Sequence, residues 1–569
     1  MSRVKRGICI LFACVSLFFA NACNQPRQQD MQSFTSYIQQ NLTQDSTLEI
    51  LPNDSVSFQE LYKLPSLNRM SEDDQNKYIS SLQVMKKIKS LDLNVDSMLY
   101  PEKNWKKLYG SILEQTKNLN ANADTLFQGT KASELNQFIK NNPGKKIQIR
   151  SQQIQLDESI VPQSNTYLIG HDTEVVKSKN PEKAMQLNQV RNVVIDGLTF
   201  KNGSDYGIYI VDSSNVLLLH NTLEQFVKKP ITVMGQNDHI NVISNKVVNN
   251  GNGGIYYDGK ISDCLIEGNL VQGNKGTSNW MAGIVLSGTE VGDPQNPYQG
   301  FGTDNHFPKS QQIQTMLHCP SNIIVRNNTV ENNNASGIYS DGAYNCYIIK
   351  NQIVNNDKEG VCLDYGTIAA YVKDNLFEKN GRRLNQTDRD LQNDFVLSFG
   401  RMQDSSAKAK LPGISLDNTA YDIVMDNHFL ENYGSGIKMV RTGVCNVIMN
   451  NNIENNNFGE NNKFHFFGIE LGNAGGDAES KDIDFTADYE NIICRNMVTG
   501  AHYSGIFLAE ESYLNDMFDN TILDAKHFSM ECLSDKYNSS LNNYSDLPSR
   551  GIWLSDKNGA IIVLPRKSD

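Results

Sequence analysis

The sequence lacks the cysteine patterns of zinc ribbons and of disulfide-stapled domains. The chain has 10 cysteines, yet no two are spaced as in a Cys-x-x-Cys pair and none shows the spacing of metal ligands. Seven cysteines lie beyond the N-terminal region, and an odd number suits a disulfide framework poorly. Several of them stand among Val and Ile residues, where a free cysteine behaves as a small hydrophobic side chain.

Long basic runs and long apolar runs are also missing. The formal net charge is -12 and the 52 Lys and Arg residues form no long run, so we expect no nucleic acid partner. Beyond the N-terminal region, no apolar stretch approaches the roughly 20 residues that a membrane-spanning helix needs. The composition is 39% hydrophobic and 20% charged, which excludes a disordered or collagen-like chain.

The N-terminus has the pattern of a secretory signal. Basic residues at 1–6 precede a short apolar stretch at 7–20, followed by Ala20-Asn21-Ala22-Cys23. This segment resembles a bacterial lipoprotein signal, although Asn21 is not the usual small residue. The resemblance implies that Cys23 is lipidated and is the only membrane attachment; an ordinary signal cleaved near Ala22 is the alternative. Both predict export, to the periplasm-facing side of the envelope or to the cell surface.

A short pattern repeats along the chain at an interval of about 24 residues. It consists of Asn-x-apolar, and a second Asn follows most copies after five residues. The copies begin at Asn221, Asn245, Asn269, Asn328, Asn351, Asn375, Asn427, Asn451, Asn496 and Asn520. Gly-apolar stretches lie between them and begin at Gly207, Gly254, Gly283, Gly337, Gly360, Gly413, Gly436, Gly468 and Gly505. Self-similarity at such a period is typical of a solenoid.

Three short strands per repeat, with turns at the Asn and Gly positions, predict parallel coils stacked on one another. Stacked Asn side chains can hydrogen-bond along the stack and satisfy turn amides that would otherwise be buried and unpaired. On these features the chain resembles the pectin-lyase-like superfamily. The resemblance implies an all-β right-handed parallel β-helix, but not one reaction, because the superfamily includes lyases, hydrolases, epimerases and adhesins.

Two regions flank the predicted solenoid. Helical periodicity begins at Met70 and again at Pro101, and we expect a tether and a helical cap over the edge of the first coil. The last stretch loses the repeat and is expected to cover the other end. The predicted organisation is a signal peptide at 1–22, a tether and cap at 23–125, the β-helix at 126–525 and a C-terminal cap at 526–569.

Acidic residues recur at one outward position of the predicted strands. The fourth residue after Gly is Asp341, Asp364 or Asp417 in three repeats. Coils stack about 4.8 Å apart, so these carboxylates are predicted to form a solvent-facing row in which the pKa of Asp364 is raised most. Such a row suits glycosidic bond hydrolysis. Each aspartate on its own could equally be a turn residue that follows a strand.

Other side chains near the row are candidate sugar-binding groups. Insertions at 289–320 and 381–412 interrupt the coils near the same strands, and long loops on a regular scaffold are usually functional or disordered. Aromatic, Arg and His side chains suit sugar stacking and hydroxyl or carboxylate recognition, although each single His has a structural alternative. The candidates are Tyr339, Lys438, Arg441, Glu470, Arg401, His306 and Trp280.

The leading hypothesis is an exported glycoside hydrolase, without a cofactor, that cleaves a poly- or oligosaccharide. Asp364 would be the general acid, and Asp341 or Asp417 would activate water. The polygalacturonase-like hydrolases of the superfamily also use an Asp cluster, but their Gly-Asp-Asp and Arg-Ile-Lys motifs are absent here, so the substrate cannot be inferred from them.

Two alternatives stay open. In a calcium-dependent polysaccharide lyase or uronate epimerase, Asp258, Asp341 or Asp364 would bind the metal. Lys438 or Arg441 would then abstract the proton next to the uronate carboxylate. A non-catalytic, glycan-binding surface protein is the other alternative, although such a protein would not need an acidic row walled by loops.

Overall fold

The computed structural model describes the coils and one helix outside them. The described residues are 101–117, 124–179, 181–201, 205–276, 278–288, 319–364, 367–382, 411–457, 467–472, 488–489, 491–500, 502–509, 512–513, 515–526, 528–532, 538–546 and 552–554. The chain divides into two compact units, residues 1–55 and 56–569, and all described residues belong to the second. None of the helices in these ranges combines the length and the apolar character that crossing a lipid bilayer requires.

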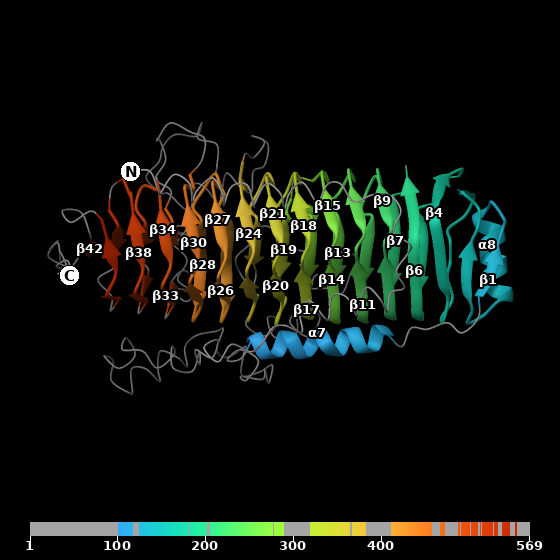
Figure 1. The fold of residues 1–569 in the computed structure, drawn as a ribbon, viewed down its shortest axis with the longest axis horizontal. Helices are drawn as coiled ribbons and strands as arrows, with labels where there is room; N and C mark the ends of the chain where they lie inside the picture. The colour runs from blue at the N-terminus through green and yellow to red at the C-terminus, as the bar shows by residue number, and fades with distance from the viewer. Residues whose placement is uncertain are drawn as a thin grey trace, which may run out of the picture. The chain divides into compact units, whose positions relative to one another are not determined.

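Each coil contributes up to three parallel strands, which stack into three columns (Figure 1). The first column contains β5 (Lys183–Asn188), β7 (Tyr206–Val211), β10 (Ile231–Met234), β13 (Ile255–Asp258), β16 (Ile284–Ser287), β19 (Ile338–Asp341), β22 (Val361–Asp364), β25 (Ile414–Ala420), β28 (Ile437–Val444), β31 (Ile469–Gly472), β35 (Ile506–Leu508), β39 (Met530–Cys532) and β42 (Ile552–Leu554). Two short strands, β32 (Asp488–Tyr489) and β36 (Ser512–Tyr513), pair beside this column.

The other two columns form one continuous sheet. The second column contains β6 (Arg191–Lys201), β8 (Ser214–Leu219), β11 (Asn237–Ile243), β14 (Ile261–Glu267), β17 (Ser321–Arg326), β20 (Tyr347–Ile349), β23 (Tyr371–Lys373), β26 (Ile423–Met425), β29 (Val447–Met449), β33 (Ile492–Cys494), β37 (Asp516–Phe518) and β40 (Ser539–Leu541). The third contains β9 (Thr222–Glu224), β12 (Lys246–Val248), β15 (Leu270–Gln272), β18 (Thr329–Glu331), β21 (Gln352–Val354), β24 (Leu376–Glu378), β27 (His428–Leu430), β30 (Asn452–Glu454), β34 (Met497–Thr499), β38 (Thr521–Leu523) and β41 (Tyr544–Ser545).

The first coils are built from β1 (Asp124–Phe127), β2 (Lys146–Ile149), β3 (Gln153–Leu156) and the long β4 (Tyr167–Lys177). The helix α8 (Ala132–Asn141) lies at this end and buries Leu135 and Ile139 in the core. At the other end the coils continue past residue 525, where we expected a cap. Strand β39 pairs with β35, and β42 pairs with β39, although Ser529 stands where the repeat has Gly.

Glycine begins the strands of the first column because neighbouring coils approach closely there. A Cβ atom at Gly360 would lie 2.7 Å from the carbonyl oxygen of Gly413 and 2.8 Å from a ring carbon of Phe377. Inside the coil, alternate side chains fill the core, where the rings of Phe377 and Phe429 stack with centroids 4.5 Å apart. The Gly-apolar pattern therefore indicates where the turn lies and also where the next coil packs closely against it.

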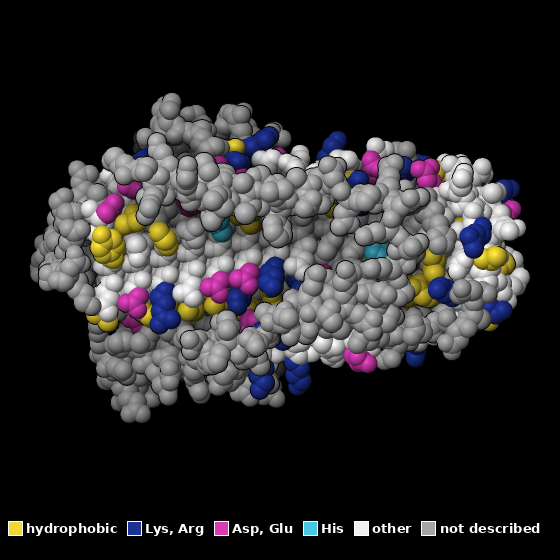
Figure 2. Space-filling model, in the orientation of Figure 1, with side chains coloured by type: hydrophobic (Ala, Val, Ile, Leu, Met, Phe, Trp, Pro, Cys, Tyr) yellow, Lys and Arg dark blue, Asp and Glu magenta, His cyan; other side chains and the backbone are white. Residues whose placement is uncertain are grey.

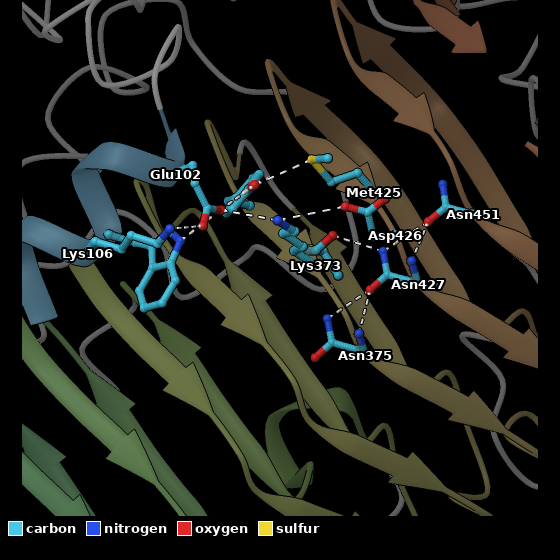
Figure 3. A network of polar contacts seen from close by, with 11 residues as sticks. Glu102, Lys106, Lys373, Asn375, Met425, Asp426, Asn427 and Asn451 are labelled. Carbon is cyan, nitrogen blue, oxygen red and sulfur yellow. Dashed lines mark hydrogen bonds and ion pairs between the residues drawn. The ribbon is translucent and has the colours of Figure 1, made fainter. Parts of the chain in front are cut away.

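The predicted asparagine ladders are present at the turns. The Oδ1 atom of Asn427 accepts hydrogen bonds from the backbone N–H and the Nδ2 of Asn375, each at 3.0 Å. The Nδ2 of Asn427 donates to Asn451 Oδ1 at 3.0 Å and to the carbonyl of Val372 at 2.9 Å (Figure 3). Each ladder residue thus satisfies buried amides of the coil before it and is satisfied by the coil after it.

The helix α7 (Pro101–Lys117) does not cover the first coil as expected, but packs along the second column (Figure 1). Thr116 contacts Asn241 of β11, and the Tyr109 hydroxyl donates to Glu267 of β14. Glu267 also pairs with Arg326 at 3.0 Å, and both side chains are almost fully buried. The helix crosses the coils because 17 residues of α-helix span about 25 Å, the rise of about five coils.

The N-terminal end of α7 is fixed by Glu102 (Figure 3). Its carboxylate pairs with Lys106 at 2.8 Å and Lys373 at 3.4 Å, and it accepts hydrogen bonds from Trp105 Nε1 and the Tyr371 hydroxyl. Burial alone would raise the pKa of Glu102, but these partners together outweigh it and lower that pKa to about 2.

On the face of the molecule drawn in Figure 2, acidic and basic side chains lie next to one another along a line.

The depressed pKa makes the stability contribution of Glu102 dependent on pH. It is fully present above the unfolded value of 4.5 and is lost as pH falls through the folded value of about 2. We expect Glu102→Gln to lower the free energy of unfolding by at most about 3 kcal/mol at pH 7, and by progressively less below pH 4. Urea unfolding of both proteins at several pH values, followed by Trp fluorescence, measures the difference. A difference that stays constant down to pH 2 would contradict the assignment.

Candidate functional site

The three candidate catalytic carboxylates lie in one row on the first column. Asp341 of β19 is in register with Asp364 of β22. In the pairing of β22 with β25, Leu363 is in register with Leu416. Asp417 of β25 therefore lies beside Asp364. The coils that begin at Gly360 and Gly413 are therefore adjacent, and the insertion between them leaves the predicted row intact. We call these three residues the acidic row.

The acidic row does not face solvent openly. The three carboxylate residues are only 4%, 6% and 8% exposed. The outward residues of the same column are also buried, because Tyr256, Val285, Tyr339 and Cys362 pack into a second hydrophobic cluster. The expectation that these positions face solvent is therefore wrong: they point away from the core but cover one another.

Aromatic side chains support this second cluster. Trp280 comes from η2 (Asn279–Met281), which precedes β16, and packs against the cluster. Its ring meets that of Tyr339 edge-on, with centroids 5.8 Å apart. The Tyr339 hydroxyl donates to Asp364 Oδ2 at 3.3 Å. Two of the predicted substrate-binding residues, Trp280 and Tyr339, are thus brought to the middle of the acidic row.

Two more predicted residues lie at the other side of the row. Lys438 of β28 and Glu470 of β31 occupy the outward position that follows Ser415 along the column. The Lys438 Nζ pairs with Glu470 Oε1 at 2.9 Å, and the Ser435 hydroxyl donates to Glu470 Oε2 at 2.7 Å. The pair presents a donor and an acceptor next to Asp417.

Sequence reasoning missed a polar group at the turn before the strands. Lys358 and Glu359, just before Gly360, are almost fully buried. The Ser336 hydroxyl donates to Glu359 at 2.8 Å, and Lys358 Nζ lies 3.2 Å from Asn279 Oδ1. The residue before each Gly could have revealed this group, because that position lies beside the row in every coil.

A partly buried lysine at the same turn position was also missed. Lys229 precedes Pro230, which replaces the usual Gly and hid strand β10 from the repeat pattern. The Lys229 Nζ lies 3.0 Å from the centroid of the Tyr256 ring, and the Tyr256 hydroxyl donates to Asp258 Oδ2 at 2.7 Å. Burial lowers the pKa of Lys229 to about 7, although the charge of Asp258 opposes the shift. The amine is therefore partly neutral at physiological pH.

Several predicted residues cannot be placed. Arg401, His306 and Cys23 lie outside the described residues. Arg441 belongs to strand β28, but its side chain is also outside what the structure describes. The acidic row, Tyr339, Trp280, Lys438 and Glu470 are thus brought together, and Asp258 lies further along the same column, separated from Asp341 by Ser287.

Within the described ranges, no group of three or more His, Cys, Asp or Glu side chains is placed to hold a metal ion. Thiolates, imidazoles and thioethers are the ligands that copper prefers. The described cysteines are buried, and burial raises the pKa of Cys346 to about 12 and that of Cys362 well above its ordinary value. These thiols do not fit a copper site, and calcium at the aspartates stays a prediction.

Two family models match parts of the chain. Residues 136–292 match a model described as "right handed beta helix region". Residues 282–466 match one described as "periplasmic copper-binding protein (NosD)". No curated protein matches the chain in sequence.

Solved structures with distant similarity include an enzyme module and an adhesin. The mannuronan C-5 epimerase AlgE4 A-module of Azotobacter vinelandii is 10% identical with a TM-score of 0.37, covering 78% of this chain and 99% of its own. PfbA, a surface adhesin of Streptococcus pneumoniae, is 12% identical with a TM-score of 0.36, covering 77% of this chain and 91% of its own. Such distant overlaps carry no argument about function.

The fold itself is settled by the coils. Parallel pairing runs from one coil to the next in all three columns, and ladders of asparagine side chains follow the turns. The repeat of about 24 residues, the three columns and the family match over residues 136–292 together identify the chain as a right-handed parallel β-helix protein.

Proposed function

We propose that this chain is an extracytoplasmic glycoside hydrolase that cleaves a poly- or oligosaccharide at the acidic row. The observation that carries the proposal is the row itself: three buried carboxylates on one outward column, one from each of three adjacent coils. Stacking in register follows from the repeat alone, as the asparagine ladders show, so the support for a chemical role is the burial of three ionisable carboxyl groups side by side. Like charges this close favour a proton on one of them.

The spacing of the coils suggests roles for the carboxylates. Neighbouring coils are about 4.8 Å apart, which suits a retaining mechanism, and alternate coils are about 10 Å apart, slightly beyond the inverting range. With Asp364 protonating the leaving oxygen, its partner Asp341 or Asp417 lies one coil away, which is the spacing of a retaining mechanism with that partner as the nucleophile. The Tyr339 hydroxyl would hold the Asp364 carboxyl group in position.

The neighbouring side chains are suited to hold a sugar. The Lys438–Glu470 pair offers a donor and an acceptor to hydroxyl groups, and Trp280 offers an apolar surface beside the row. An exported location fits the secretory pattern of the N-terminus, and one of the matching families is described as periplasmic.

A proton-abstracting lyase or epimerase is the second candidate, and Lys229 is the observation that favours it. A general base must be unprotonated, and a pKa of about 7 leaves much of this amine neutral. Lys438, considered for this role from the sequence, is instead paired with Glu470. If Lys229 is the base, it would remove the proton next to a uronate carboxylate.

The lyase candidate predicts a specific pH profile. Activity should rise as pH increases through about 7, because the Lys229 amine loses its proton there, and Lys229→Met should abolish it. The absorbance of unsaturated uronides measures the rate. Lys228→Met is the matched control, because Lys228 is the adjacent residue but pairs with Asp205 at the surface. Full activity of Lys229→Met would exclude this base.

One screen separates the candidates. The purified protein is incubated with a panel of polysaccharides, with and without a chelator, and the products are tested for new reducing ends and for unsaturated uronides. Reducing ends without unsaturation, insensitive to chelator, would support hydrolysis. Unsaturated products would support the lyase. Binding without any new ends would leave an epimerase, recognised by a changed uronate composition of the recovered polysaccharide, or a glycan-binding protein.

A further inference from the structure

Three aromatic rings gather at the C-terminal end of the first column. Phe467 precedes Gly468, Tyr503 lies in the turn before β35, and Phe507 is the central residue of β35. The rings of Phe467 and Phe507 stack with centroids 4.2 Å apart at 11°, and Tyr503 meets Phe467 edge-on at 6.1 Å. We call these three residues the aromatic platform.

The aromatic platform faces outward and remains accessible. Ile506 and Leu508 belong to the core, so Phe507, between them, points away from it. Phe467 is almost fully buried beneath the other rings, whereas Tyr503 and Phe507 are only half-buried. A stacked aromatic group with an accessible side, on the same column as a candidate site, is characteristic of a binding surface.

The platform is continuous with the acidic row. The outward position of the column runs through Ser415, Lys438 and Glu470 to Phe507, in register from coil to coil. Three coil steps separate Asp417 from the platform, which is about 14 Å. The Lys438–Glu470 pair lies between them, and a second carboxylate, Glu531, follows Phe507 and accepts a hydrogen bond from Ser504.

This order of groups matches the chemistry of a sugar chain. Pyranose rings have apolar C–H faces that pack on aromatic rings and hydroxyl groups that bond to charged side chains. At the other end of the column the tyrosine rings are covered by the chain's own lysines: Lys183 lies 4.2 Å from the Tyr209 centroid and Lys229 lies 3.0 Å from that of Tyr256. Stacking of an apolar sugar face is thus better suited to the C-terminal side.

We propose that the aromatic platform is a distal sugar-binding subsite, so that the substrate is a polysaccharide chain lying along the column rather than a short oligosaccharide. A single sugar ring at the acidic row cannot also reach Phe507, three coils away, so the subsite adds affinity only for longer chains. The proposal rests on the proposed function for the identity of the ligand as a glycan, but not on hydrolysis.

Chain-length dependence of binding tests the proposal. Disaccharide and octasaccharide fragments, prepared from xylan, β-glucan, pectin and alginate, are titrated against the full protein. We expect Phe507→Ala and Tyr503→Ala to weaken binding of the recognised octasaccharide about tenfold and to leave the disaccharide unchanged. Phe507→Leu keeps an apolar side chain without the ring and should resemble the alanine variant, whereas Phe507→Tyr should bind like the wild type.

The controls separate the subsite from folding and from catalysis. Met497→Ala removes an exposed apolar side chain from the third column, on neighbouring coils, and should have no effect. Octasaccharide binding by a folded Phe507→Leu protein that equals wild type would overturn the subsite, as would equal affinity of the wild type for short and long fragments. Full turnover by both Asp364→Asn and Asp417→Asn would overturn hydrolysis at the acidic row alone, because the length dependence of binding does not require cleavage.

Discussion

Asp364→Asn is expected to lower kcat on the cleaved glycan by about two to four powers of ten, the usual contribution of a positioned general acid. Asparagine has nearly the same shape, and its carbonyl oxygen can still accept the hydrogen bond from the Tyr339 hydroxyl. It has no acidic proton to transfer to the leaving oxygen. We therefore expect kcat to fall while the affinity for the substrate stays unchanged. Release of reducing ends at saturating substrate measures kcat, and titration with the uncleaved fragment measures binding.

The matched control for this variant is Asp238→Asn. Asp238 lies near the start of β11, in the second column rather than in the acidic row, and its half-exposed carboxylate pairs with His239 at 2.8 Å. The same chemical change should leave kcat and the midpoint of thermal unfolding unaltered there. If Asp364→Asn and Asp417→Asn both retained full activity on a glycan that the wild type cleaves, the hydrolase assignment would fail.

Much of this site was predictable because a solenoid is regular. Once the period is known, residues at equal positions in successive coils must stack, which placed Asp341, Asp364 and Asp417 in one row. The same regularity predicted the asparagine ladders, since a turn amide buried between coils needs a partner in the next coil. The position of the row could be predicted from the length of the repeat and from the alignment of its glycine residues alone.

The parts of the structure that could not be predicted depend on residues that do not follow the repeat pattern or on contacts between different coils. Pro230 conceals strand β10, because proline fills the close-approach position that glycine usually holds and so breaks the Gly-apolar pattern. The burial of Tyr339 depends on Trp280, which comes from a different coil. The position of α7 depends on Glu267 and Arg326, which occupy outward positions of the second column and carry no repeat signal.

The asparagine ladders should contribute strongly to stability, and Asn427→Ala is expected to lower the free energy of unfolding by about 4 kcal/mol. The side chain is 2% exposed. Its removal leaves the backbone N–H and the Nδ2 of Asn375 without their acceptor, and deprives the carbonyl of Val372 and the Oδ1 of Asn451 of a donor. Each buried polar group left unsatisfied costs about 1 to 3 kcal/mol, and the effects overlap because they share one site.

The expected loss should also be local. Each coil of a solenoid contacts only its neighbours, so the coils of Asn375 and Asn451 should lose amide protection from hydrogen exchange before distant coils do. Asn452→Ala is the matched control, because Asn452 lies on the outer side of β30 in the adjacent coil and is half-buried. Urea unfolding of both variants distinguishes the two positions. A loss below about 1 kcal/mol for Asn427→Ala, the net value of an ordinary hydrogen bond, would show that the coils hold together by packing of the core alone.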